Sequence, residues 1–129
     1  PAIKVVQELA GKIPLLGLGL GHLVTALALG GQTYKLKFGH RGSNHPVRNL
    51  QTGHIQITTQ NHGYAVAEKN LPADLTITHR HLHDETVEGF ASQKLKVTTV
   101  QHTPGDLTEI TAPEHPFNLF RKYLPVPAL

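Results

Sequence analysis

Apolar residues and glycines alternate over 15–23, and an alanine- and leucine-rich run follows over 24–31. An apolar run of strand length, a glycine-rich turn and a helix-forming segment, in that order, predict a buried strand, a tight turn and a helix. Gly17, Gly19 and Gly21 occupy every second position across the turn. Small residues two places either side of a central position are typical of a turn that presents a nucleophile between a strand and a helix. The central position holds Gly19, which has no side chain. The sequence therefore predicts a turn of the kind that carries a catalytic nucleophile, but without the nucleophile.

The same segment has plainer interpretations. A membrane span needs about 20 apolar residues, and this stretch is interrupted by five glycines and by His22. A dinucleotide-binding loop would need a third glycine where His22 stands and an acidic residue about 20 positions later. A buried strand, turn and helix without any catalytic role fits the pattern as well as the nucleophile mounting does.

The rest of the pattern predicts an α/β domain. Apolar residues spaced by three to four over 1–11 predict an amphipathic helix. This helix is followed by a buried strand over 13–18 and by a second helix over 21–29. Alternating helices and buried strands are typical of a parallel α/β sheet. Several short strands between Thr33 and Gln101 indicate an antiparallel or mixed extension. We predict these strands at 33–38, 54–59, 64–66, 75–82, 87–90 and 95–101, with a polar loop at 39–46, a turn at 60–63 and a last helix at 117–124.

Size and composition limit the classes of protein to which this chain can belong. With 129 residues and 39% hydrophobic content, we expect residues 1–129 to form one domain. The absence of cysteine excludes disulfides, thiolate metal ligands and a cysteine nucleophile. A net charge of +3 with scattered basic residues does not indicate a nucleic-acid surface. Since no secretion signal is visible, we predict the cytoplasm. A chain that starts at Pro1 and lacks methionine indicates a fragment, a processed chain or an edited one.

Three histidines alternate along the strand predicted at 75–82, namely His79, His81 and His83. Side chains two residues apart share one face of a strand, and imidazoles so placed are a conceivable set of zinc ligands. No carboxylate is spaced to complete such a site, and histidines on a solvent-exposed face are the simpler interpretation. We therefore assign no metal site and no cofactor, and keep the metal hypothesis as an alternative.

Four segments together resemble one known family. These segments are 17–22 (GLGLGH), 37–47 (KFGHRGSNHPV), 60–66 (QNHGYAV) and 86–89 (TVEG). In this order they are similar to the glutaminase half of the small subunit of carbamoyl-phosphate synthase, a class I glutamine amidotransferase domain. The likeness is colinear over about 1–102 and loosens toward Phe120. It implies part of a flavodoxin-like parallel sheet with flanking helices and an antiparallel extension. It also implies that the family's first strand and glycine-rich oxyanion loop are missing before Pro1.

The resemblance implies the reaction that the family catalyses, and it also implies that this chain has lost that reaction. Family members hydrolyse glutamine with a cysteine, a histidine and a glutamate, and pass the ammonia to a large subunit that makes carbamoyl phosphate for pyrimidine and arginine synthesis. The matching positions here are Gly19, Thr103 and Gly105, and a slip of one residue would bring His102 to the histidine position. Because no register restores a thiol, we expect this chain to be inactive.

The family's glutamine-binding positions match Leu20, Asn61, Gly63 and Tyr64. Asn-x-Gly-Tyr is equally a natural turn that enters a strand. The family's glutamine after the elbow histidine is Leu23 here, so we expect binding of glutamine to be weak or lost.

A second hypothesis is a non-catalytic interaction module that docks on a synthase large subunit, or on another copy of this chain, through the donor-rich segment 39–46. If the family's first strand is missing, an unpaired sheet edge remains, and we predict self-association through it.

Overall fold

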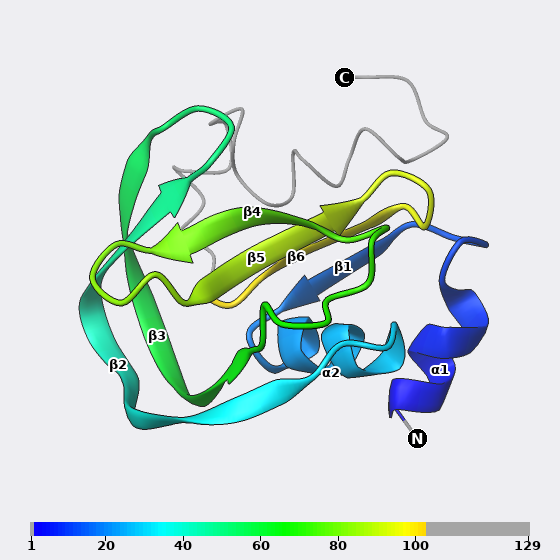
Figure 1. Cartoon of the computed structure of the whole chain (residues 1–129), viewed down its shortest axis with the longest axis horizontal. Coiled ribbons are helices and arrows are strands. Elements are labelled where there is room, and N and C mark those ends of the chain that lie inside the picture. The colour runs from blue at the N-terminus through cyan, green and yellow to red at the C-terminus, as the bar shows by residue number, and fades with distance from the viewer. Residues whose placement is uncertain (1, 103–129) are drawn as a thin grey trace.

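The computed structural model describes residues 2–102. Two helices and six strands follow one another in the order α1 (Ala2–Leu9), β1 (Leu15–Leu18), α2 (Leu20–Ala28), β2 (Thr33–Asn49), β3 (Ile55–Val66), β4 (Thr76–His81), β5 (Val87–Ser92) and β6 (Val97–Val100). The strands form one sheet in the order β1-β6-β5-β3-β2-β4. Both helices lie on the same side of the β1-β6-β5 part of this sheet (Figure 1). The helices predicted at 1–11 and 21–29 are confirmed, and the helix predicted at 117–124 falls outside the described residues.

The sheet is mainly antiparallel. Strands β1 and β6 run parallel, from the pair Leu15 and Val97 to the pair Leu18 and Val100. All other pairings of the described strands are antiparallel. The antiparallel extension predicted between Thr33 and Gln101 is therefore confirmed, and the parallel part of the described sheet is one strand pair, smaller than the sequence pattern indicates.

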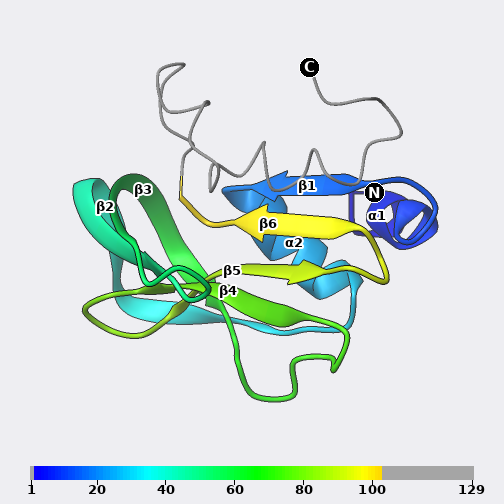
Figure 2. The same cartoon turned by 90° about the horizontal axis from the view of Figure 1, so that it is seen from above.

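Four of the strands close into a ring. Strand β2 pairs with β3 and β4, and β5 pairs with β3 and β4, so each of the four has two neighbours within the ring. Figure 2 shows β2 and β3 curling away from the β1-β6 end of the sheet to make this closure. A closed arrangement has an interior, so side chains that a flat sheet would expose to water become buried.

The polar segments 39–46 and 60–63 were predicted as a loop and a turn, and this prediction is wrong. Both lie within long strands, β2 and β3, and pair with each other. The register of the pairing shifts between Lys35 and His40, where Gly39 lies, and again between Gly42 and His45. Gly39 has φ +72°, and a Cβ on it would lie 2.8 Å from the backbone oxygen of His62. Glycine is needed there by the close approach of two strands, which local sequence does not reveal.

The core lies between α2 and the centre of the sheet. It is built around buried Phe90 and Val97, with Ala26 contributed by α2. Gly17 allows α2 to approach β1 closely, because a Cβ on Gly17 would lie 2.8 Å from the backbone oxygen of Gly21. Among the described residues, neither helix has the length and apolar character needed to cross a membrane. The interpretation of 15–31 as a strand, a turn and a helix is confirmed.

Candidate functional site

Gly19 joins the end of β1 to the start of α2 in a sharp turn. Its backbone has φ 58° and ψ −117°, a conformation that is costly for residues with a side chain and typical of functional turns. Its N–H donates to the oxygen of Val100 at 3.0 Å, and its own oxygen accepts from the N–H of His22 at 3.0 Å. A Cβ on Gly19 would have Gln101 O as its nearest neighbour, at 4.0 Å. The turn is therefore fixed by the backbone and has room for a side chain that the sequence does not supply.

A pocket of about 370 Å³ opens beside this turn. Its lining consists of Gly19, Leu20, Leu23, Asn61, His62, Gly63, Tyr64 and Gln101. The structure thus brings together all four residues that the resemblance assigned to glutamine binding, from α2 and from β3. The side chains of Leu20 and Tyr64 are 74% and 50% exposed, so they form the rim.

Two lining residues were not predicted as site residues. Gln101 Nε2 lies 3.4 Å from Gly19 O, which ties the chain after β6 to the turn. His62 Nδ1 donates to Tyr64 O at 2.7 Å. A signal was available for His62, because it lies inside the segment 60–66 that carries the resemblance, whereas Gln101 lies outside the four segments.

The pocket offers hydrogen-bonding groups without a strong nucleophile. No cysteine, serine, threonine, lysine or carboxylate is among its described lining residues. Burial lowers the pKa of His62 to about 4, an effect that its hydrogen bond to Tyr64 opposes and the positive charge of neighbouring groups increases. His62 is therefore neutral near pH 7, and the pocket is suited to hold a polar ligand more than to attack it.

The histidines close to the turn face the interior. His22 is fully buried, with Nδ1 2.8 Å from Thr99 Oγ1, and burial is the main cause that lowers its pKa to about 3. His102 is also buried, with its ring 6.0 Å from that of His79, and it is not among the residues that line the pocket. Thr103 and Gly105 lie outside the described residues.

The prediction that His79, His81 and His83 share a solvent-exposed face is wrong for the first two. His79 and His81 are 6% and 2% exposed, whereas His83 is exposed and follows the end of β4. The register of β4 against β5 shifts on both sides of His79, and the buried positions of β4 are those of His79 and His81. Gly89 on β5 makes room for His79, because a Cβ on Gly89 would lie 2.8 Å from His79 Nδ1.

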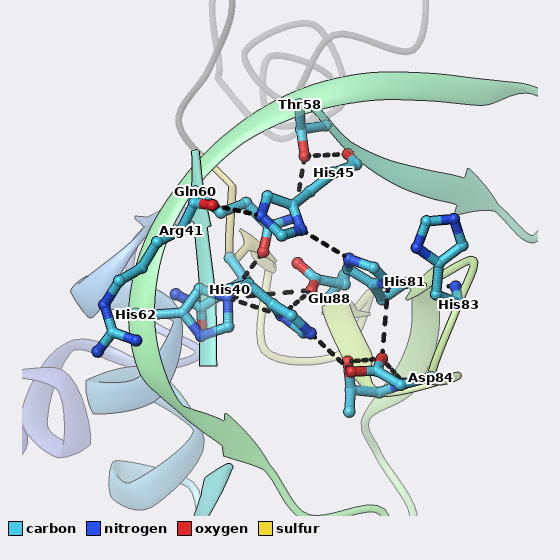
Figure 3. Close-up of polar contacts among 12 residues, drawn as sticks. His40, Arg41, His45, Thr58, Gln60, His62, His81, His83, Asp84 and Glu88 are labelled. Carbon is cyan, nitrogen blue, oxygen red and sulfur yellow. Dashed lines mark hydrogen bonds and ion pairs between the residues drawn. The ribbon is translucent and has the colours of Figure 1, made fainter. Parts of the chain in front are cut away.

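A second group of polar side chains fills the ring of strands (Figure 3). We call it the imidazole cluster, and it consists of His40, His45, His62, His81, Asp84 and Glu88. His40 Nε2 lies 2.6 Å from Asp84 Oδ2, and its Nδ1 lies 3.2 Å from His62 Nε2 and 3.3 Å from Glu88 Oε1.

Charges in the cluster are strongly coupled. Burial raises the pKa of Glu88, although His40 opposes this. Burial lowers the pKa of His40, but its contacts with Glu88 and Asp84 outweigh burial and raise it overall. Burial opposes ionisation of Asp84, yet hydrogen bonds from Thr86 and His40 lower its pKa to about 2. The two carboxylates therefore favour the protonated form of His40.

The family is decided by comparison with known proteins. Residues 1–123 match the family described as glutamine amidotransferase class-I. This chain belongs to that family. The pocket is lined by Leu20, Asn61, Gly63 and Tyr64, for which the resemblance predicts a role in glutamine binding, and that role stays a prediction.

Two similar curated proteins share one description, carbamoyl phosphate synthase small chain. The chain is 54% identical over 105 residues to the carbamoyl phosphate synthase small chain of Symbiobacterium thermophilum, covering 80% of this chain and 29% of that protein. It is 51% identical over 125 residues to the protein of the same description in Bacillus cereus, covering 95% of this chain and 33% of that protein. The chain thus spans about a third of the length of these relatives.

Solved structures show the same fold. A glutamine amidotransferase from Thermotoga maritima superposes with a TM-score of 0.65 at 23% identity, covering 78% of this chain and 45% of that one. A putative GMP synthase component from Thermoplasma acidophilum gives a TM-score of 0.62 at 24% identity, covering 85% of this chain and 55% of the other. The class I amidotransferase fold predicted from the sequence is therefore shown at the level of overall architecture.

Proposed function

We propose that this chain is a glutaminase domain of the carbamoyl phosphate synthase small-chain type that does not hydrolyse glutamine. The observation that carries the proposal is Gly19. It stands at a strand-to-helix turn with the backbone of a nucleophile position and 4.0 Å of clearance at its Cβ. Without a thiol on that turn, no covalent intermediate with glutamine forms.

The pocket supports recognition of a glutamine-like ligand with low affinity. Asn61, Gly63 and Tyr64 present an amide side chain, backbone groups and an aromatic ring to one side of it. Leu23 on α2 lines the pocket with an apolar side chain that cannot satisfy a buried polar group. Each hydrogen bond that is not made leaves part of the ligand's desolvation uncompensated, so binding is weak.

A titration with glutamine tests both parts of the proposal. Ammonia release by the chain should equal that of a solution without protein. Amide NMR shifts should move at Gly63 and Tyr64, with a Kd of about 1 mM or weaker. The variant Asn61→Ala serves as the control and should abolish the shifts, because Asn61 lines the pocket. Ammonia release above background would overturn the proposed inactivity, and an absence of shifts would overturn the proposed recognition.

A second candidate function is an interaction module, and exposed apolar side chains favour it. Phe38 on β2 is 82% exposed and Ile57 on β3 is 62% exposed. Among the described strands, β1 pairs on one side only, with β6. Apolar side chains and an open strand edge are features that a second protein chain covers, here a synthase large subunit or another copy of this chain.

Sedimentation and co-purification separate these partners. Phe38→Ser should weaken association by about tenfold if the exposed ring anchors the contact. Lys69→Ser is the matched control, because Lys69 is exposed beyond the end of β3. A monomer at all concentrations that also fails to co-purify with a synthase large subunit would rule out the interaction module.

A further inference from the structure

Glu88 is a buried carboxylate in an unusual setting. Its side chain is 0% exposed, and within residues 2–102 neither of its oxygens accepts a hydrogen bond. Burying a carboxylate without hydrogen bonds is costly, and in folded proteins such groups are paired with cations or coordinate metals. An ion-pair contact with His40 Nδ1 at 3.3 Å is the nearest compensation.

Ligand atoms from different strands converge on Glu88. His40 belongs to β2, His62 to β3, His81 to β4 and Glu88 to β5. His40 Nδ1 lies 3.2 Å from His62 Nε2, and Glu88 Oε1 lies 4.0 Å from His62 Nε2. One ligand atom each from His40, His81 and Glu88 fit within 4.8 Å of one another. Figure 3 shows the imidazoles grouped around the Glu88 carboxylate.

These separations suit a small tetrahedral metal ion. With bonds of about 2.0–2.1 Å to nitrogen, neighbouring ligands of tetrahedral zinc are separated by about 3.3 Å. The distances of 3.2 Å and 3.3 Å made by His40 Nδ1 are close to this value, whereas the 4.0 Å between His62 Nε2 and Glu88 Oε1 would have to shorten on binding. We propose that His40, His62, His81 and Glu88 bind one divalent transition-metal ion of the zinc class.

Hydrogen bonds outside the ligand atoms orient the rings for this role. His40 Nε2 donates to Asp84 Oδ2 at 2.6 Å, so Nδ1, which faces Glu88 Oε1 at 3.3 Å, is the nitrogen that would release its proton to bind the ion. His62 Nδ1 donates to Tyr64 O at 2.7 Å, and its Nε2 lies 2.7 Å from Gln60 Oε1, a contact that Nε2 would exchange for the ion on binding. A ligand histidine whose other nitrogen donates to a carboxylate or a backbone oxygen is the usual arrangement in protein zinc sites.

The proposed site differs from the glutamine pocket. His62 borders both, and His40, His81 and Glu88 do not line the pocket. An ion bound there would link β2, β3, β4 and β5. Its binding should therefore stabilise the ring that these four strands form. The inference does not depend on whether the chain hydrolyses or binds glutamine.

Zinc titration of the chain, prepared without a histidine tag and stripped with a chelator, tests the proposal. Calorimetry and elemental analysis after dialysis should give one tightly bound zinc per chain, and zinc should raise the Tm. Glu88→Gln should weaken binding at least tenfold by removing a charged ligand. Asp84→Asn should weaken it about 10- to 100-fold, as loss of an orienting carboxylate does. His54→Gln is the control, because His54 is exposed and outside the cluster, and it should bind as the parent does.

The Asp84→Asn variant keeps the proposal testable if Glu88→Gln fails to fold. The Asp84 side chain is 43% exposed, so its replacement by asparagine is compatible with folding. Cobalt substitution adds a spectroscopic readout, since tetrahedral cobalt with histidine ligands absorbs visible light strongly. Absence of tight zinc binding in the parent, or equal binding by the parent and a folded Asp84→Asn variant, would overturn the proposal.

Discussion

Replacing Gly19 by cysteine, Thr103 by histidine and Gly105 by glutamate should produce a chain that releases ammonia from glutamine, whereas the parent stays at background. Removing the nucleophile and base of a hydrolase costs on the order of 10⁶ in kcat, because these residues act as a unit. Partial restoration should return about 10³-fold over background. The measurement is ammonia release at saturating glutamine, with the fold of each variant checked by circular dichroism.

The geometry at Gly19 is the reason to expect this result. The turn leaves 4.0 Å between a Cβ and the nearest atom, so a cysteine fits if its strained backbone is tolerated. The N-terminus of α2 begins at Leu20, and its partial positive charge favours a thiolate at the preceding residue. Leu20 directly follows Gly19, and the backbone N–H of the residue after a nucleophile is a group that stabilises the oxyanion in turns of this type.

Two partial variants separate the contribution of the thiol from that of the histidine and glutamate. Gly19→Cys alone should gain a thiol that reacts rapidly with iodoacetamide, without fast turnover of glutamine. Thr103→His with Gly105→Glu should remain at background, because it lacks the thiol. A folded triple variant that labels with iodoacetamide but never releases ammonia would show that the turn and the pocket are insufficient for catalysis.

The sequence predicted the turn well because its determinants are local. Gly17 is required by the approach of α2 to β1, and Gly19 by its positive φ. Gly21 is different, because a Cβ there would meet nothing within 4 Å. The prediction that both flanking positions need small residues is therefore supported at Gly17 alone.

The ring of strands escaped prediction because its determinants are not local. Glycine and polar residues in 39–46 read as a loop, yet partners from β3 hold this segment in a strand. His40 and His81 read as polar surface residues, but ring closure places them inside, with ring centroids 4.1 Å apart. A sequence pattern does not show which strands close on one another, so burial of these histidines required the structure.

Acidification should destabilise this fold, mainly through buried neutral histidines. Burial lowers the pKa of His22 to about 3 and that of His79 to about 4. Between these values and the unfolded pKa of about 6.5, the unfolded chain binds protons that the folded chain does not. Stability therefore rises with pH through this range, and it should fall by about 2 kcal/mol per histidine between pH 7.5 and pH 5. Urea denaturation at both pH values, with a chelator present, measures the loss.

The imidazole cluster contributes in both directions, because burial lowers the pKa values of His62 and His81 to about 4 while those of His40 and Glu88 are raised, so single variants are needed to isolate the effect of one histidine. The raised pKa values of His40 and Glu88 contribute stability at low pH that is lost as pH rises through them. His22→Gln removes one buried imidazole outside the cluster, so its loss of stability between pH 7.5 and pH 5 should be about 2 kcal/mol smaller than that of the parent. His54→Gln changes an exposed ring and should retain the full dependence. If His22→Gln and the parent lose stability equally, His22 is protonated in the folded state, and its contact with Thr99 Oγ1 must then be one that the imidazolium donates.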